Sequence, residues 1–595
     1  MPVRAQVPAW LLPSEWVRAL AGPILDKELR VASRRRRNFA LRLAYLVLLT
    51  AFVLLVWVEE VRYGGSAAWR VTRMAEAGRT ITAVIVWFQF VTMQLLALLV
   101  LSAAISEEVH RRTLGVLMTT PVSGFQIVVG KLLSGLLQLG LLLAVSLPLL
   151  VVVRVFGGVP WDFVASGLCI TLTAALFAGS LSLYFSIGSR RSYWVFLQAA
   201  VTMLVLFFVF PWACVMLGHW SEVEFTDSLV GWLNPWAAML VATEQMSSAR
   251  TRLAGYPWPF HCLAMTGASA ALLAVCVAKV RRVALAQIAG ETPADRRAAS
   301  RAARLGPAAP AAPAGAIRRI TGSPVVWREV RTSLTHSRRR ALRVAAATLG
   351  LLLVTYVIGW RDLAHDNDTH IVYVLILTGL GLLATSVLAA SGITAEKEAG
   401  TWPLLLCTTL SGGEILLGKA VGVFRRSAPV WLLLALHVVL FVMLGCIHPI
   451  VPFHLAMISA GVVVFLTGTG LFFGTCFRRT TVAVVMNLGL ALALWAVLPL
   501  IAMLVGEVLS GSDDLWEWPL CMNPMAQAIV AAEHTVRSDN AAKALGGLDY
   551  YWPKPVDHIG VGPTTIAFLA TMVVYMFAGW VFAVLAAVLV RRRAL

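Results

Sequence analysis

Long apolar segments alternate with short polar stretches along most of the chain. Each long segment can cross a hydrocarbon core, which needs about 20 helical residues. In the first half they lie near residues 39–58, 81–105, 126–153, 163–187, 194–218 and 259–278. In the second half they lie near residues 343–360, 371–394, 425–447, 454–477, 482–504 and 563–589. The pattern predicts an all-α polytopic membrane protein with about 12 transmembrane helices.

The polar stretch after the second apolar segment occurs twice. Residues Glu108–Lys131 match Glu396–Lys419 at a constant separation of 288 positions. Other matching sites are Pro23, Glu28 and Arg30 with Pro324, Glu329 and Arg331, Arg190-Arg191 with Arg478-Arg479, and Asn234-Pro235 with Asn523-Pro524. Membrane composition alone does not produce such a run of matching polar positions. The chain is therefore predicted to contain two repeats.

The number of spans fixes how these repeats are related. Each half has an even number, so both enter and leave the membrane on the same side, as parallel repeats do. We expect residues 1–289 to form the first six-helix half and 317–595 the second, joined by an Ala-, Pro- and Arg-rich linker at 290–316. Residues 10–38 are predicted to form an interfacial amphipathic helix. Short helices in the outer leaflet are expected around each Asn-Pro turn.

Charge adds an orientation to this picture. Only 13% of the residues are charged, against about 25% in a soluble domain. The net charge of +19 comes from short basic clusters at span ends, which predicts no nucleic-acid partner. By the positive-inside rule these clusters place both termini in the cytoplasm. The arginines of loop 59–80 disagree, and we give more weight to the clusters.

The sequence offers no recognisable catalytic, nucleotide or metal site. Residues 413–419 match the start of a phosphate-binding loop, but Ala420 stands where a hydroxyl must hold magnesium. Ser411-Gly412 is instead expected to start a helix, with Lys419 extending towards the headgroups. Residues 365–370 are predicted to be a solvated loop and His437 a packing residue. Ionisable residues are nearly absent from the spans, which disfavours an ion-coupled carrier.

The repeated polar stretch is the part most suited to a partner. Leu114 and Leu117, with Met118, share one side of a short amphipathic segment that ends at Thr120-Pro121. A short helix of this kind suits docking into a groove on another protein. The alternative is a plain surface turn between two spans.

These motifs together resemble the permease subunits of type-2 ABC exporters. The resemblance is carried by Glu-x-x-x-x-Thr-Leu at 108–114, Thr-Pro-x-Ser at 120–123, Gly-Lys at 130–131, and the Asn-Pro turn before the sixth span. It implies two six-span halves fused in one chain, in a prokaryotic plasma membrane. It also implies separate cytoplasmic ATPase subunits, two of them expected, which hold ATP and magnesium and drive a substrate outward. No cofactor or catalytic residue is implied on this chain.

The resemblance also names the residues that would meet the ATPase. These are Glu108, Thr113, Leu114, Leu117, Thr120 and Pro121 in the first segment, and Glu396, Thr401, Leu405 and Thr408 in the second. Because Pro403 replaces Gly115, we predict unequal segments. The first would be a helix over 107–119 that includes Glu108. The second would be shorter, begin near Thr401 and follow Glu396.

Two other functions remain open at this point. One is a membrane scaffold or sensor that docks an ATPase without moving a solute. The other, less favoured, is an ion-coupled carrier. No distinctive polar lining of the spans identifies a substrate.

Overall fold

The structure of the chain is a computed structural model. It describes residues 43, 45–47, 49–51, 53–54, 67–111, 113–117, 122–189, 192–212, 214, 233–247, 258–288, 323–331, 338–360, 363, 367–499, 502, 519–533, 548–552 and 558–592. Two compact units are present, one made of residues 1–208 and 224–317 and the other of residues 209–223 and 318–595. The amphipathic segment 10–38 and the linker 290–316 lie outside the described residues.

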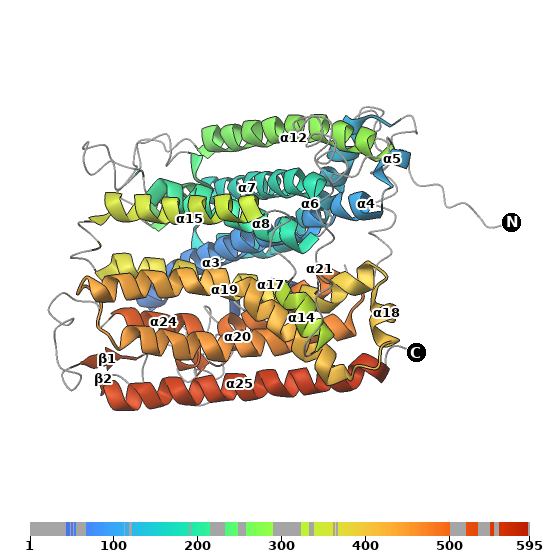
Figure 1. Cartoon of the computed structure of the whole chain (residues 1–595). Coiled ribbons are helices and arrows are strands. Elements are labelled where there is room, and N and C mark those ends of the chain that lie inside the picture. Colours follow the sequence, from blue (N-terminus) through green and yellow to red (C-terminus); the bar gives the residue numbers. More distant parts are fainter. Residues whose placement is uncertain are drawn as a thin grey trace. The chain divides into compact units, whose positions relative to one another are not determined.

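Unit 1 is a bundle of long helices (Figure 1). Its elements are α3 (Ala67–Ser102), α4 (Ser106–Arg111), α5 (Leu114–Leu117), α6 (Gly124–Gly157), α7 (Trp161–Gly188), α8 (Ser192–Leu204), η2 (Val205–Val209), α11 (Pro235–Ser247) and α12 (Trp258–Ile288). Helix α7 is the central element, because α3, α6, α8, α11 and α12 all pack against it. The η2 segment is a π-helical turn that continues α8.

Unit 2 is also a bundle of long helices, and more of its elements are described than in unit 1. Its elements are α14 (Pro324–Arg331), α15 (Arg338–Ile358), α17 (Asn367–Glu398), α18 (Trp402–Leu406), α19 (Gly412–Met443), α20 (Val451–Cys476), α21 (Thr480–Leu492), η4 (Ala493–Val497), α24 (Pro524–Glu533), β1 (Asp549–Tyr551), β2 (His558–Gly560) and α25 (Val561–Arg592). The two strands form an antiparallel hairpin with Tyr550 opposite Ile559. The hairpin and α18 lie at opposite ends of α25 (Figure 1).

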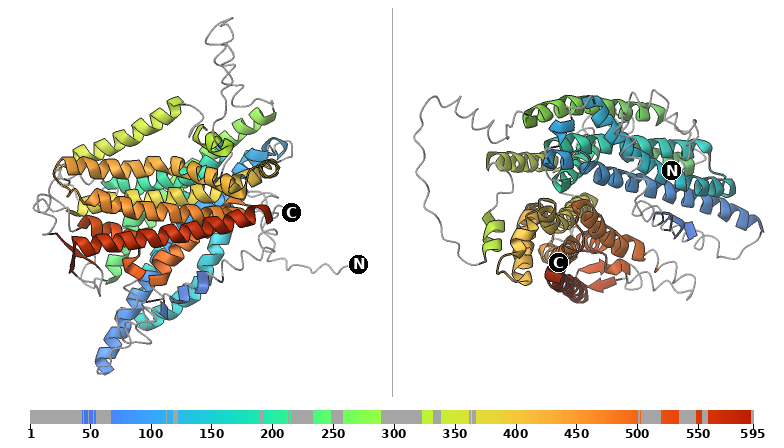
Figure 2. Two further views of the ribbon diagram at one scale, coloured as in Figure 1. Left: turned by 60° about the horizontal axis from the view of Figure 1, so that its bottom comes forward. Right: turned by 90° about the vertical axis from the view of Figure 1, so that its right-hand side faces the viewer.

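Helices α20 and α25 run side by side along their length (Figure 2). Glycine makes this closeness possible. A methyl group placed on Gly468 would lie 2.0 Å from the carbonyl oxygen of Gly579, so the two backbones touch directly. Small residues at such a crossing are typical of helices packed in lipid, where dispersion contacts replace the hydrophobic effect.

The predicted fold class is confirmed. Among the described residues, ten helices are long and apolar enough to cross a membrane. The expected span at 343–360 is α15, with a shorter apolar part at Ala346–Ile358, and the expected span at 39–58 is described only in part. Short helices do follow both Asn-Pro turns, as α11 and α24. The β-hairpin was not predicted.

One helix start was predicted correctly and one loop wrongly. Helix α19 begins at Gly412, where Ser411 and Glu414 form a reciprocal capping box, as expected for Ser411-Gly412 and earlier than the apolar span near residues 425–447. His370 is not part of a solvated loop. It lies buried in α17, where its Nε2 is 2.7 Å from the Leu363 carbonyl oxygen. His365 and Asp366 lie outside the described residues.

Candidate functional site

The first repeated segment begins where α3 ends. The chain turns at residues 103–105, forms α4, and then runs through Thr113 into α5. The backbone N–H of Thr113 donates to the carbonyl oxygen of Glu108 at 3.1 Å. The Glu108 carboxylate pairs with the Lys131 ammonium on α6 at 2.7 Å. The first contact closes the chain between α4 and α5, and the second ties α4 to α6.

The second segment has the same two contacts at the equivalent positions. The N–H of Thr401 donates to the carbonyl oxygen of Glu396 at 3.0 Å. The Glu396 carboxylate pairs with Lys419 on α19 at 2.6 Å. Gly400, between them, has a positive φ of 69°, which a glycine adopts without strain when it ends a helix such as α17. Both segments are therefore closed by the same glutamate, lysine and threonine.

Each segment contains a matching helix start. Ser123 accepts from the N–H of Gln126, and the Gln126 side chain accepts from the N–H of Ser123. Ser411 and Glu414 make the same reciprocal pair. A capping box satisfies amides that have no partner inside the helix, so α6 and α19 begin at fixed, equivalent positions within the segments.

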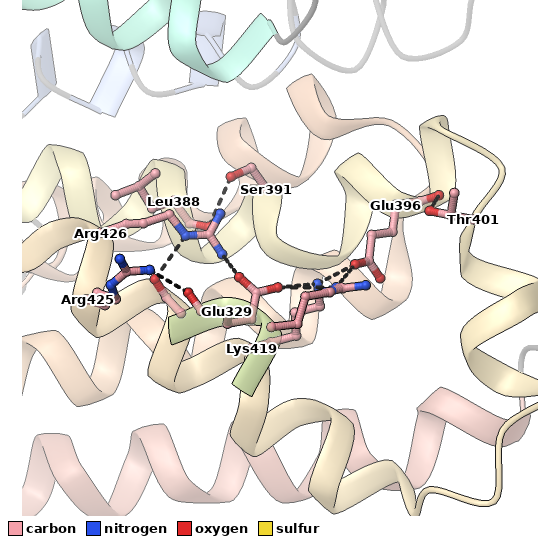
Figure 3. A network of polar contacts seen from close by, with 10 residues as sticks. Glu329, Leu388, Ser391, Glu396, Thr401, Lys419, Arg425 and Arg426 are labelled. Carbon is pink, nitrogen blue, oxygen red and sulfur yellow. Dashed lines mark hydrogen bonds and ion pairs between the residues drawn. The ribbon is translucent and has the colours of Figure 1, made fainter. Parts of the chain in front are cut away.

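In unit 2 the glutamate–lysine pair belongs to a larger ion cluster, drawn in Figure 3. Glu329 of α14 lies at its centre, with its carboxylate 2.9 Å from Lys419 and 2.7 Å from Arg426. Arg328, next to it in sequence, contacts both Glu329 and Glu396. The cluster joins α14 to α19 and to the end of α17, directly before the second segment.

Burial and charge have opposite effects on this cluster. Burial would raise the pKa of the Glu329 carboxyl, but Lys419 and then Arg426 outweigh it, and the net pKa lies below its ordinary value. Burial would likewise lower the pKa of Arg328, and Glu396 reverses this to a net increase. Both groups are held in their charged forms, and around the buried Glu329 the neighbouring cations offset the lost hydration.

The structure corrects the expectation for Lys419. Its side chain does not extend to the headgroups, because it is only 3% exposed and pairs with both Glu329 and Glu396. The sequence signal that would have found this pair is the repeat itself. Lys131 and Lys419 are matched, and each segment also carries a matched glutamate of opposite charge.

The helix predicted for the first segment is wrong, while the predicted inequality of the two segments stays a prediction. No single helix runs over 107–119, because α4 ends at Arg111 and Thr113 is not helical. Glu108 lies in α4 and Glu396 lies at the end of α17, so each precedes its short helix. The predicted start of the second helix is correct, since Thr401 is the N-cap residue of α18.

The short helices α5 and α18 turn equivalent residues inward and outward. Leu114 and Trp402 face inward, at 0% and 8% exposure, and pack in the apolar cores of their units. Val116 and Leu404, also separated by 288 positions, are 66% and 70% exposed. An isolated exposed apolar residue is ordinary. Here, however, an exposed apolar residue occupies the same repeat position in both segments, and this was not predicted from the sequence.

The other predicted docking residues divide into three groups. Leu405 is partly buried against the core around Trp402. Thr408 is exposed, and its hydroxyl donates to the carbonyl oxygen of Leu405. Thr120, Pro121 and the side chain of Leu117 lie outside the described residues.

The remaining candidate chemistry is structural. His437 is fully buried beside Tyr356, whose hydroxyl is 2.6 Å from its Nδ1, and Phe441 packs on its ring. This agrees with the packing role predicted for it. Within the described residues, no group of three or more histidine, cysteine, aspartate or glutamate side chains could hold a metal ion.

Comparison with known proteins places the first half of the chain. Residues 23–285 match the family described as "ABC-2 family transporter protein". No curated protein matches the sequence. The match spans the helices of unit 1 and the first repeated segment, and it agrees with the apolar helices found in both units. Residues 23–285 are therefore similar to the ABC-2 transporter family, and the apolar helices of both units are those of a multi-pass membrane protein.

Proposed function

We propose that the chain is the permease subunit of an ATP-binding cassette exporter. In this proposal residues 1–289 and 317–595 are two permease halves joined by the linker 290–316. Two separate ATPase subunits bind the cytoplasmic segments 108–131 and 396–419, hold ATP and magnesium, and drive an outward movement of substrate. The protein would lie in a prokaryotic inner membrane with both termini in the cytoplasm.

The observation that carries the proposal is the repeated geometry of the two segments. Each presents an exposed apolar residue, Val116 or Leu404, on a short helix. The Glu108–Lys131 or the Glu396–Lys419 ion pair joins the two helices between which that short helix lies. An anchored apolar tip suits insertion into a groove of a partner, because its position is fixed before binding.

The glutamates add a second feature. Oε2 of Glu108 and Oε2 of Glu396 have no hydrogen-bond partner among the described residues. A buried carboxylate oxygen without a donor is costly. A donor supplied by the partner after a small rotation of the side chain would therefore stabilise the complex at both segments equally.

The proposal is tested by co-purification with an ATPase encoded beside this chain. We expect the wild-type complex to hydrolyse ATP and the permease alone to have no such activity. Val116→Arg combined with Leu404→Arg should abolish co-purification, since each places a charge in an apolar contact. Tyr551→Arg, on the hairpin at the other end of unit 2 (Figure 1), is the matched control and should bind normally. Normal binding by the double variant would refute the docking assignment.

The transport step needs its own measurement. Inverted vesicles that contain the complete complex should take up the substrate only in the presence of ATP. A complex that binds and hydrolyses ATP without moving any member of a broad compound panel would favour a membrane scaffold or sensor. Uptake driven by an ion gradient without ATP would favour a carrier.

Orientation follows from the same proposal. A single cysteine at position 115 or 403, in a version that lacks the native cysteines, should be protected from an impermeant thiol reagent in intact cells. A cysteine at position 551 should be labelled. Labelling of residue 115 or 403 from outside would reverse the proposed topology.

A further inference from the structure

Each unit contains a π-helical turn at the same place in the repeat. Residues Val205–Val209 and Ala493–Val497 form these turns, and they are separated by 288 positions. A π turn inserts one residue into an α-helix and interrupts its regular hydrogen-bond ladder. A carbonyl group at such a turn needs a donor from elsewhere when no water is present.

The donor in both units is the asparagine of the Asn-Pro turn. Nδ2 of Asn234 donates to the carbonyl oxygen of Phe207 at 2.8 Å. Nδ2 of Asn523 donates to the carbonyl oxygen of Trp495 at 2.7 Å. Phe207 lies within the first π turn and Trp495 within the second. The two contacts thus use the same atoms at equivalent positions.

The same asparagines also begin the short helices. Oδ1 of Asn234 accepts from the N–H of Trp236 at 3.0 Å, and Oδ1 of Asn523 accepts from the N–H of Met525 at 2.9 Å. Their backbone carbonyls accept from Ala238 and Gln527, which marks them as N-cap residues of α11 and α24. Each side chain therefore caps one helix with its oxygen and holds another with its nitrogen.

The two contacts made by each side chain explain why asparagine occurs at both positions. Serine or aspartate caps a helix as well as asparagine does. An ionised aspartate has no donor for the carbonyl oxygen, and serine has no amide group with which to reach it. Asparagine supplies an acceptor and a donor from one short side chain, and both repeats use it.

We propose that Asn234 and Asn523 are positioning residues that fix α11 and α24 to the π turns of the preceding spans. The π turn and the short helix then move as one body. The role of these contacts in transport rests on the proposed permease function, but the test of the contacts does not require an ATPase. Transport would reshape the region between the fifth and sixth spans of each half through these two contacts.

The test is hydrogen exchange measured by mass spectrometry on the full chain in lipid nanodiscs. Asn523→Ser retains a capping oxygen and removes the donor. We expect the amides of residues 493–498 to exchange about tenfold faster than in the wild type, because a buried carbonyl loses its partner. Helix α24 itself should stay protected, since its cap remains.

The control is Gln527→Glu on the same helix. It removes an amide donor to the Cys521 carbonyl and to the Thr571 hydroxyl, but it does not touch the π turn. Exchange over 493–498 should therefore equal that of the wild type. If Asn523→Ser also leaves these amides unchanged, or if it unfolds α24 to the same extent as the π turn, the positioning role is wrong.

A second variant gives a readout that a merely structural role would not produce. In Asn523→Asp the contact becomes titratable, because a protonated carboxyl donates and a carboxylate does not. Protection of 493–498, corrected for intrinsic rates, should fall as the pH rises from about 5 to about 8. The neighbouring side chain of Tyr575, whose hydroxyl donates to the carbonyl oxygen of Met522, is a phenol and does not ionise in that range. A flat profile equal to that of the wild type would overturn the proposal.

Failure of the proposed function is a separate result. Loss of all ATPase binding by the wild-type chain would refute the permease assignment and leave the exchange experiment unaffected. Unchanged exchange in Asn523→Ser would refute the positioning role and leave ATPase binding unaffected.

Discussion

In the first half, α3 ends at Ser102 and the chain turns before α4 begins, whereas in the second half α17 runs unbroken to Glu398. Ser186 of α7 supports the turn, because its Oγ accepts from the N–H groups of Ile105 and Ser106 at 3.2 and 2.7 Å. The equivalent residue of α20 is Gly474. A methyl group on Gly474 would lie 3.3 Å from the Ala390 carbonyl oxygen, so α17 passes close to the α20 backbone.

The helices that lead into the segments are thus supported by different means. A hydroxyl replaces the lost ladder bonds in the first half. In the second half α17 is unbroken, and it is held to α20 by close backbone packing and by the Lys397 ammonium, which donates to the carbonyl oxygens of Gly474 and Thr475. The tips nevertheless have the same Glu–Lys–Thr geometry. Because the Glu–Lys–Thr geometry is the same in both halves although the supporting contacts differ, we associate this geometry with partner binding.

The largest effect is expected from Glu329→Gln. The change leaves the buried Lys419 and Arg426 with less negative charge around them, and breaking a buried ion cluster costs about 3 kcal/mol. Thermal unfolding of the purified chain in detergent should show a clear loss of stability. Glu414→Gln, which alters an exposed capping carboxylate, is the control and should cause a much smaller change. Equal shifts would mean that the cluster contributes no special stability.

Ser186→Ala and Gly474→Ala test the two supports directly. The first leaves two buried N–H groups without their acceptor, at a cost of about 2 kcal/mol. The second adds a methyl group that contacts the Ala390 carbonyl and should cost about 1 kcal/mol. Exchanging the pair, with glycine at 186 and serine at 474, should not restore stability. Tolerance of that exchange would show that the supports are interchangeable.

A pH titration sharpens the comparison further. Since the folded pKa of Glu329 is lowered from 4.5, its contribution is fully present above pH 4.5 and is lost as the pH falls through the folded value. The wild type should therefore lose stability on acidification below that point more steeply than Glu329→Gln. Parallel curves for the two proteins would contradict the assignment of the lowered pKa to this carboxyl.

The smallest effects are expected at the threonines. The hydroxyls of Thr113 and Thr401 lie 3.5 and 3.4 Å from the glutamate carbonyls, and the backbone N–H groups make the shorter bonds. Thr113→Val and Thr401→Val should each change stability by less than about 0.5 kcal/mol. If either variant loses more partner binding than this stability change explains, the hydroxyl contacts the partner directly.

Much of the fold was predictable from the sequence, because an apolar run of about 20 residues has few alternatives to a membrane helix. The short helix starting at Thr401 was also predictable, since a threonine followed by a tryptophan and a proline suits a helix N-terminus. The break in the first segment was not. The sequence predicted one helix over 107–119, while the chain is not helical at Thr113.

The ion cluster was beyond sequence reasoning for a different reason. Lysine at a span end ordinarily extends to the headgroups, and only the three-dimensional arrangement brings Glu329, 90 residues away, next to Lys419. The outward position of Val116 and Leu404 has a similar origin. It depends on which face of a single helical turn packs against the core, and four or five residues are too few for an apolar period to decide this.

The most direct test of the central claim counts ATPase copies bound to one permease chain, by native mass spectrometry of the detergent-solubilised complex. Because the two tips have the same geometry, the wild-type chain should bind two copies. Val116→Arg and Leu404→Arg should each bind one, and the double variant none. One copy on the wild-type chain, or loss of both copies from either single variant, would contradict the account of two equivalent docking segments.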